Sequence, residues 1–435
     1  MATTKNITMK QFNGTDYDTL YPKTVAAQID DVYSKSETYS KSQLYTQSQL
    51  YTKGQVLTNA TKTLYGLGSS AVPDDAFVAS VVANTGYIHI TTKTSSGVVA
   101  GIPIMIDGVY AGKTGVNGKA RISVPFGAHT IKVVRPLDIA SITPNTFNIN
   151  VTDVNAIVLE STCVLSTATE ATISTSGNYG FSDRVEDFDV CAVGGGGGGA
   201  AAVAWSSSYE MDAPGGGGGY VNNAYNLIAS HFNAFSATVG AGGTGGSLDA
   251  STVSQSEYQV GRDGGKSELT SLLGYGVGAT ADGGKAAVGA GTYMGPGGKG
   301  GSGGGGAAVN SDGAGGTSAA GTNGSDGETV RLTSTLKAVG GTGQGTTTKP
   351  FGDSSRTALS PGGGGAEVHG TTGSKGTTQT NGSPGVYSTS TAVSATKSTI
   401  MGAGGGSAAA KTQSGTVKGA DGADGGFVIR WRFKS

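Results

Sequence analysis

The stretch Val193–Tyr220 reads VGGGGGGAAAVAWSSSYEMDAPGGGGGY, so six consecutive glycines and then five enclose a short segment of small and aromatic residues. Glycine stays frequent to the end of the chain: 14 of the 78 glycines precede residue 194 and the other 64 follow it. Glycine has no side chain to bury and loses more backbone entropy on ordering than any other residue. This part of the chain is therefore either a flexible linker or a structure in which backbones pack on each other.

Both ends of the glycine-rich region have the composition of β-strands. Val185–Val193 combines β-favouring residues with acids, and Gly426–Phe433 alternates apolar and basic residues. A flexible tail needs no closing strand, so the two segments indicate a folded unit. Between them glycine recurs every third residue, at Gly297/Gly300/Gly303/Gly306, Gly321/Gly324/Gly327, Gly370/Gly373/Gly376 and Gly419/Gly422/Gly425.

A period of three matches the polyproline-II helix, which has about three residues per turn and no internal hydrogen bonds. Without Cβ atoms, several such helices can lie close enough to satisfy each other's N–H and C=O groups. Collagen shares the period, but the chain has only 11 prolines and its registers are short. We predict a fold that is mainly β and irregular with little α-helix: a fibrous N-terminal shaft, a β-sandwich spacer and a glycine-rich β and polyproline-II-type head.

The order of these elements resembles the glycine-rich domain of bacteriophage and prophage tail proteins, and more loosely the polyglycine-helix adhesins at tail-fibre tips. The resemblance covers roughly residues 163–435. It is carried by the two glycine runs, Ala237-Thr-Val-Gly-Ala-Gly-Gly243, Gly264-Gly-Lys-Ser267 and the terminal Gly-Gly-Phe-Val-Ile-Arg-Trp. The closing strand and the Val-Gly-Ala-Gly-Gly element are more specific than the glycine runs. The resemblance implies that residues 163–435 form an adhesive domain.

Two segments at the N-terminus are predicted to attach and extend this domain. Residues 1–30 include Met9–Pro22, which is similar to the opening of tail proteins from prophages of Gram-positive bacteria. That similarity implies docking onto phage tail or baseplate proteins, whereas the residues alone indicate only an aromatic-bearing arm. Residues 31–65 contain four six-residue repeats that begin at Tyr33, Tyr39, Tyr45 and Tyr51.

The six-residue spacing places all four tyrosines on one face of an extended chain but carries them around an α-helix. Three intertwined copies would give the tyrosine face a core, and similar Tyr-Ser/Thr-Lys repeats occur in tail-fibre proteins. We therefore predict a homotrimeric shaft; the alternative is a disordered polar linker.

Residues 66–85 are predicted to be a linker, and residues 86–162 a β-sandwich. Apolar and polar residues alternate in short runs, with turn signals at Asp107-Gly108, Asn117-Gly118 and Phe126-Gly127. The run Ile104–Val134 resembles the carboxypeptidase-regulatory-like or PEGA-like sandwich. That resemblance implies a domain for spacing and binding without catalytic residues.

The motifs that would indicate catalysis or a cofactor are either incomplete or lack the surrounding structure that they need. Gly261–Ser267 ends like a phosphate-binding loop, but Val260 stands where the first glycine is required. Gly298–Gly303 satisfies G-x-G-x-x-G without a surrounding βαβ unit. The four histidines are scattered without metal-ligand spacing. We expect no enzymatic activity, no cofactor and no metal, and we expect Cys163 and Cys191 to be free thiols.

Charge and hydropathy narrow the set of partners. The 29 basic and 30 acidic residues nearly cancel, so neither nucleic acid nor an anionic membrane is indicated. No apolar run reaches the roughly 18 residues that span a bilayer, and residues 1–21 lack the apolar centre of a secretory signal. We expect synthesis in the host cytoplasm and action outside the cell, as part of a virion at the host surface.

Aromatic and polar residues gather between the glycine runs, where rings can stack on sugars and polar side chains can bond hydroxyl groups. For Trp205 and Tyr209, binding and packing between helices are both open; packing is favoured for the other three. The receptor-binding candidates are Trp205, Tyr209, Tyr293, Phe351 and Tyr387.

The sequence as a whole predicts a trimeric phage tail-fibre or receptor-binding protein that attaches to a bacterial cell-surface glycan. One alternative is a structural tail or baseplate component that binds no receptor. The other is a tailspike that degrades polysaccharide, whose carboxylates would come from distant positions in the chain.

Overall fold

The computed structural model describes residues 9–12, 17–20, 85–206, 210–287, 294–295, 297–301, 304, 307–308, 348–369, 372–376 and 382–435. The chain divides into two compact units, Met1–Thr85 and Gly86–Ser435. In the first unit, β1 (Met9–Phe12) pairs with β2 (Tyr17–Leu20) as an antiparallel hairpin. The tyrosine repeats and nearly all of the predicted linker lie outside the described residues.

The predicted β-sandwich is present at the start of the second unit. One sheet has the order β6-β3-β10-β8 and the other β5-β4-β7-β9. Alternate strand residues face a shared core that includes Ile88, Ile104 and Ile131, each fully buried. The strands are β3 (Thr85–Lys93), β4 (Pro103–Ile106), β5 (Val109–Lys113), β6 (Lys119–Pro125), β7 (Gly127–Val133), β8 (Ile139–Thr143), β9 (Thr146–Val151) and β10 (Ala156–Leu165).

The last strand of the sandwich extends beyond residue 162, where the sequence predicted that the sandwich ends. β10 continues to Leu165, and Cys163 is 2 % exposed within the sandwich core. Three strands, β5, β8 and β10, had no separate sequence prediction; β10 pairs in parallel with β3 and antiparallel with β8.

The two strands that flank the glycine-rich region pair with each other. In what we call the base sheet, with order β11-β29-β13-β16, the register places Asp189 opposite Arg430. A second sheet, β12-β17-β20-β21, shares with it a core that contains Phe181, Phe188, Phe235 and Trp431. The strands are β11 (Glu170–Ile173), β12 (Gly177–Tyr179), β13 (Val185–Val193), β16 (Val221–Ile228), β17 (Phe235–Thr238), β20 (Ser267–Ser271), β21 (Val277–Ala281) and β29 (Gly426–Phe433).

The run Gly194–Gly199 is the central member of a bundle of extended glycine segments. Each of its N–H groups donates to another segment, and residues three apart donate to the same one, at distances of 2.8–3.0 Å. Gly194 donates to the carbonyl group of Tyr220 and Gly197 to that of Gly217. In the second segment the acceptors are Gly265 for Gly195 and Arg262 for Gly198. In the third they are Ala423 for Gly196 and Ala420 for Gly199. Three residues per turn with no bond inside the run is the pattern of a polyproline-II helix, as the glycine spacing predicted.

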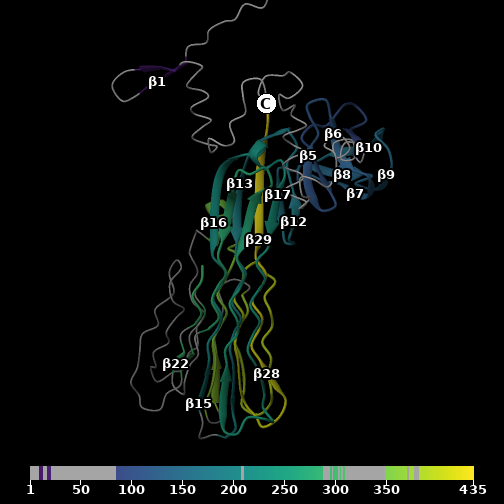
Figure 1. Cartoon of the computed structure of the whole chain (residues 1–435). Helices are drawn as coiled ribbons and strands as arrows, with labels where there is room; N and C mark the ends of the chain where they lie inside the picture. The colour runs from purple at the N-terminus through teal and green to yellow at the C-terminus, as the bar shows by residue number, and fades with distance from the viewer. Residues whose placement is uncertain are drawn as a thin grey trace, which may run out of the picture. The chain divides into compact units, whose positions relative to one another are not determined.

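The carbonyl groups of the central run bond to a second set of segments. Gly196 and Gly199 accept from Gly243 and Gly246, so this neighbour runs in the same direction as the central run. The carbonyl groups of Gly195 and Gly197 accept from Gly284 and Gly405. Since these neighbours approach through their backbones, the N–H groups of the central run are satisfied without side chains, whereas outer segments also bond to side chains, as Gly242 and Gly245 do to Asp424 and Asp421. Figure 1 shows these segments side by side between β13 and β29 at one end and β15 and β28 at the other.

Small sheets follow the glycine segments at the end away from the base; we call this end the tip. The orders are β19-β14-β27-β26, β15-β24-β25, β18-β28 and β22-β23. The strands are β14 (Ala201–Ala204), β15 (Glu210–Ala213), β18 (Ser247–Asp249), β19 (Ser256–Gln259), β22 (Met294–Gly295), β23 (Ala307–Ala308), β24 (Ala366–His369), β25 (Thr372–Lys375), β26 (Val386–Ser388), β27 (Ala408–Lys411) and β28 (Thr416–Lys418).

Helical structure in the described residues is limited to two short 3-10 turns, η2 (Ala229–Phe232) and η4 (Pro350–Gly352). The prediction of a mainly β and irregular fold with little helix is therefore confirmed. None of the helices in the described part of the chain is long and apolar enough to cross a membrane.

Candidate functional site

The tip sheet β19-β14-β27-β26 places two tyrosines at its opposite edges. Tyr258 lies opposite Ala202, Ala202 opposite Ala409, and Ala409 opposite Tyr387, so the four residues form one row across the sheet. The two alanines are fully buried, and each tyrosine keeps 40 % of its surface exposed. Three strand spacings separate the tyrosines, which is about 14 Å.

The central residues of the row are small because a second sheet packs on them. Ala202 and Ala409 belong to a buried cluster that also contains Met211, Ala213 and Val368 of β15 and β24. Only small side chains let two sheets approach here, so larger residues are confined to the edges of the row. The glycine bundle and these alanines therefore form a fixed platform from which aromatic rings project.

Tyr387 forms one wall of a shallow pocket. Its ring lies against Gly373 of β25, where an added Cβ atom would overlap the ring. The pocket is lined by Lys375, Val386, Tyr387, Val393 and Ser394. An aromatic face beside an ammonium group and a hydroxyl group can stack on a sugar ring and bond its oxygen atoms.

Trp205 directly follows β14 and is 39 % exposed. Its backbone N–H donates to the Gln255 carbonyl at 2.8 Å, which fixes the start of this loop against the segment before β19. Thus Trp205, just after β14, and Tyr387, on β26, belong to the same tip sheet, with β27 between their two strands. Tyr209 and Tyr293 lie outside the described residues.

Phe351 lies on the base sheet, at the other end of the glycine bundle from the tip. It is 8 % exposed and packs with Cys191, Val193, Val221 and Val428. Its N–H donates to the Asn223 side-chain oxygen at 2.9 Å, and the Arg430 guanidinium lies 4.2 Å from the ring centre. The ring fills a gap over the sheet, which fits the packing alternative; it does not join Trp205 and Tyr387 in one site.

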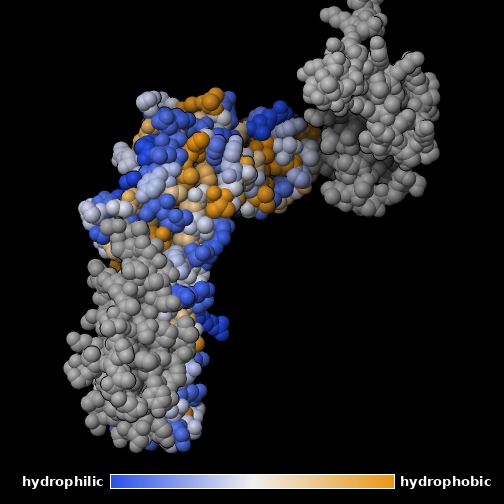
Figure 2. Space-filling model, turned by 90° about the vertical axis from the view of Figure 1, so that its left-hand side faces the viewer, coloured by the Kyte–Doolittle hydropathy of each residue, from blue (hydrophilic) through white to orange (hydrophobic). Residues whose placement is uncertain are grey.

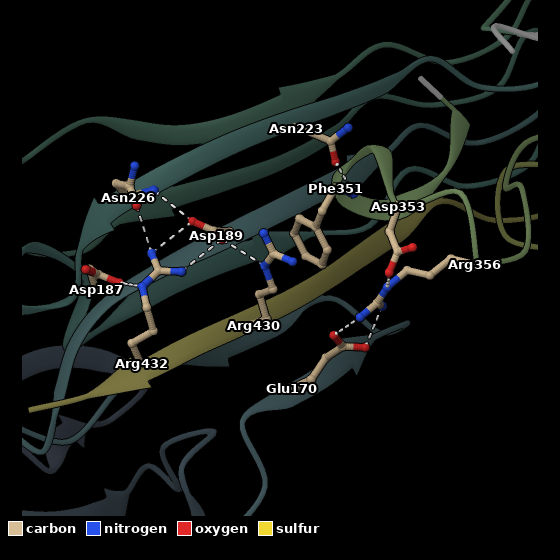
Figure 3. A network of polar contacts seen from close by, with 10 residues as sticks. All are labelled: Glu170, Asp187, Asp189, Asn223, Asn226, Phe351, Asp353, Arg356, Arg430 and Arg432. Carbon is tan, nitrogen blue, oxygen red and sulfur yellow. Dashed lines mark hydrogen bonds and ion pairs between the residues drawn. The ribbon is translucent and has the colours of Figure 1, made fainter. Parts of the chain in front are cut away.

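A charged network beside Phe351 joins β13 and β29, the two central strands of the base sheet (Figure 3). Asp189, whose side chain is 3 % exposed, accepts from Arg430 at 2.8 Å and from Arg432 at 3.0 and 3.1 Å. The N–H of Asn226 donates to the same carboxylate at 2.8 Å. Burial alone raises the pKa of Asp189, but the hydrogen bonds from Arg432, Asn226 and Arg430 outweigh it and lower that pKa to about 2.

The segment that carries Phe351 is tied to the same sheet by a second ion pair. Arg356 donates to both oxygens of Glu170 at 2.8 and 2.6 Å, and it also pairs with Asp353 at 3.4 Å (Figure 3). Every acid of this network has an arginine partner. The arrangement is therefore suited to holding strands together rather than to proton transfer.

Comparison with known families is consistent with this architecture. The family model of the glycine-rich domain matches residues 170–432, which is more than half of the chain. The chain belongs to the glycine-rich domain family. No curated protein sequence matches the chain.

The glycine-rich domain and the sandwich each hold one free, buried cysteine. Burial raises the pKa of Cys163 to about 11 and that of Cys191 to about 12, so both thiols stay protonated near neutral pH. The two residues belong to separate cores, as expected for unpaired thiols. Among the described residues, no group of three or more His, Cys, Asp and Glu side chains could hold a metal ion.

Where Figure 2 draws it in colour, the side of the glycine-rich domain that carries β16 shows mainly hydrophilic residues with hydrophobic residues in small groups. Exposed apolar residues on β16 and at the start of β21 include Tyr225, Ile228 and Val277. Scattered residues of this kind are ordinary on a soluble surface. The aromatic residues of the tip are therefore better candidates for recognition than this face.

Two residues of the tip were not among the binding candidates predicted from the sequence. Tyr258 and Lys375 join the candidates only through strand pairings and packing between segments far apart in the chain. The alternation of residues around Tyr258 indicates a strand, but no local signal says which strand lies beside it. Lys375 lies within the glycine register Gly370/Gly373/Gly376, where its local sequence is that of an ordinary loop lysine.

Proposed function

We propose that this protein is a phage or prophage tail-fibre or receptor-binding protein that attaches a virion to a glycan on the bacterial surface. The observation that carries the proposal is the tip sheet, where half-exposed Trp205, Tyr258 and Tyr387 project from a platform of buried alanines and glycines. A platform held by backbone hydrogen bonds keeps such rings in fixed positions, which lowers the entropy that binding costs.

The chemistry of the tip suits a sugar ligand. Aromatic faces stack on the apolar face of a sugar ring, and the hydroxyl and ammonium groups near Tyr387 can bond its oxygen atoms. Each single contact of this type is weak. A homotrimer would carry three copies of the site, and their combined avidity can exceed the affinity of one site by a factor of about 100 to 10,000.

The N-terminal part of the chain completes the proposal. Residues 1–30 would dock onto tail or baseplate proteins, and the tyrosine repeats would form a trimeric shaft that carries the head away from the virion. Light scattering of the intact protein at micromolar concentration tests the trimer. A mass of one chain would contradict the proposed assembly.

The binding function is tested by labelling the purified full-length protein and measuring which bacterial surfaces it decorates. We expect binding to a restricted set of strains, and competition by glycan purified from a decorated strain. A protein that decorates none of a wide panel but binds purified tail components would instead be a structural part of the tail. Release of reducing ends from a capsule or wall preparation would point to a polysaccharide-degrading tailspike.

A further inference from the structure

Three polar side chains from distant parts of the chain meet where the sandwich contacts the base. Lys113 ends β5, Asp183 precedes β13, and Asn233 follows η2. The Lys113 ammonium lies 2.7 Å from Asn233 Oδ1 and 3.1 Å from Asp183 Oδ1. Asp183 Oδ1 in turn accepts from Asn233 Nδ2 at 3.1 Å.

The side-chain amide of Asn233 is held in one orientation. The residue is 1 % exposed, and its Nδ2 donates to the Phe181 carbonyl at 2.8 Å as well as to Asp183. Since Nδ2 has two acceptors and Oδ1 faces an ammonium group, the hydrogen bonds decide which end of the amide is the carbonyl. The backbone carbonyl of Asn233 also accepts from the Phe181 N–H at 3.2 Å. The carbonyl carbon Cγ therefore stays beside the lysine nitrogen.

Asp183 is fixed just as closely by the sandwich. Its N–H donates to the Ala100 carbonyl at 3.1 Å. An added Cβ at Gly101 would lie 2.6 Å from Asp183 Oδ1 and 2.7 Å from its Cγ, so only a glycine lets the backbone pass this close to the carboxylate. Gly101 also has a φ of +80°, which favours glycine. The carboxylate is thus positioned by the backbone before any reaction.

We propose that Lys113 and Asn233 become joined by an intramolecular isopeptide bond, with Asp183 as the catalytic acid and base. A nucleophilic amine, an amide carbonyl and a carboxylate that touches both nitrogens are the groups that this reaction needs. Other lysine pairs in the described part of the chain face carboxylates, as Lys93 of the sandwich faces Glu160 and Lys285 of the glycine bundle faces Asp263. A carboxylate does not expel ammonia, so these pairs serve as internal comparisons.

The reaction balances without any further reactant. Asp183 takes a proton from the Lys113 ammonium, and the freed Nζ attacks Cγ of Asn233 to form a C–N bond. Asp183 then returns the proton to Nδ2, the bond between Cγ and Nδ2 breaks, and ammonia leaves; the second proton lost by Nζ leaves with it as ammonium. Lys113 and Asp183 remain 34 % and 27 % exposed, which gives the ammonia a path to solvent.

The bond would join the sandwich to the glycine-rich domain across 120 residues of sequence. A covalent closure of a long loop restricts the unfolded chain and stabilises the folded one. It would also keep the two regions together under mechanical load, where hydrogen bonds alone break one after another.

The test is the intact mass of the denatured full-length protein. We expect a mass below that of the sequence by one ammonia molecule, and a proteolytic peptide in which Lys113 and Asn233 are linked. Lys113→Arg keeps the positive charge but removes the nucleophile, and Asp183→Asn removes the proton carrier; both should restore the full mass. Lys285→Arg is the matched control and should keep the lower mass.

A cyclic imide at Asn117-Gly118 would lose the same mass, so the peptide map and hydroxylamine are needed to separate the two products. Hydroxylamine opens an imide but leaves an isopeptide bond intact. Wild-type protein that keeps its full mass after prolonged incubation at neutral pH, with unmodified Lys113 and Asn233 peptides, would overturn the proposal. So would a loss of mass that persists in Lys113→Arg.

Discussion

The base and the glycine bundle are stabilised in different ways, although the glycine segments continue directly from strands of the base, as Gly194–Gly199 continues from β13. The base has a side-chain core, in which the Phe181 and Phe188 ring centres lie 4.7 Å apart and Phe235 is fully buried. The central run of the bundle has no side chains to pack, and each of its glycines gives its N–H to a neighbouring segment. Apolar burial stabilises the first region, and close backbone contact with satisfied hydrogen bonds stabilises the second.

This difference predicts which amino-acid substitutions each region tolerates. A side-chain core can absorb a smaller residue at a cost set by the cavity, because surrounding side chains relax in part. The central glycines face backbone carbonyl groups, which cannot rotate away from a new Cβ atom. Substitutions in the base should therefore lower its stability in proportion to the side-chain volume removed, whereas the central glycines of the bundle should tolerate no other residue.

The largest effect is expected for Gly196→Val in the centre of the bundle. An added Cβ at Gly196 meets the Ala403 carbonyl, and we expect the head not to fold. Gly300→Val, which faces the Gly218 carbonyl on an outer segment, should cost about 3 kcal/mol or more. Circular dichroism and thermal unfolding measure both changes. Gly97→Ala is the control, since its Cβ would meet nothing within 4 Å.

A Gly300→Val protein as stable as the parent would contradict the close-packed bundle. If Gly97→Ala were as harmful as Gly196→Val, the effect would come from the loss of glycine flexibility and not from backbone contact.

Phe235→Ala should be the next largest change. The ring is fully buried in the base core, so its removal should cost about 3–5 kcal/mol in the free energy of unfolding. Phe235→Leu keeps most of the volume and should cost only about 1–2 kcal/mol. Denaturant unfolding of the pair tests the graded response. Equal losses for Leu and Ala would mean that the base is as intolerant as the bundle.

Asp189 should make stability depend on acid pH. Its pKa is about 2 in the folded protein against an ordinary 3.8, so its contribution is present above about pH 4 and is lost as pH falls toward 2. The shift corresponds to about 2 kcal/mol for this buried carboxylate. Asp189→Asn should reduce stability at pH 7 and flatten the dependence between pH 4 and 2, measured by denaturant unfolding.

Glu160→Gln is the matched control for Asp189, because the Glu160–Lys93 pair is 2.7 Å long but its side chains are 52 % and 44 % exposed. An exposed pair should change stability by less than about 1 kcal/mol. Glu160→Gln should keep the acid dependence of the parent, and an acid dependence as steep in Asp189→Asn as in Glu160→Gln would place the acid sensitivity of the protein elsewhere.

The smallest effect on stability is expected at the tip. Trp205→Ala combined with Tyr209→Ala should leave thermal unfolding nearly unchanged while weakening cell binding by a factor of about 10 to 100, as for the aromatic centre of a binding surface. Tyr387→Ala should act in the same direction. Adsorption of labelled protein, measured beside its unfolding curve, separates the two effects. Unchanged adsorption in both variants would remove the tip sheet from the binding site.

Much of the base and bundle could be predicted because the signals are local. The register Gly419/Gly422/Gly425 faces the carbonyl groups of Gly199, Gly196 and Val193 in order, as a helix of three residues per turn requires. The alternation in Gly426–Phe433 likewise indicated the closing strand. Phe351 shows the limit of such signals, because its local sequence resembles a loop and only the strands beneath it make a buried place for its ring.

The sequence by itself determined the conformation of each segment: strands where apolar and polar residues alternate, and three-fold helices where glycine removes every Cβ. Only the tertiary structure decided which segments became neighbours. The surfaces of glycine segments are nearly identical, so their sequence does not specify which segment packs beside which. The strands and loops at the ends of the segments set that pairing. For the same reason Tyr258 and Tyr387 share a row, and Lys113 meets Asn233 across 120 residues, through contacts that no local pattern records.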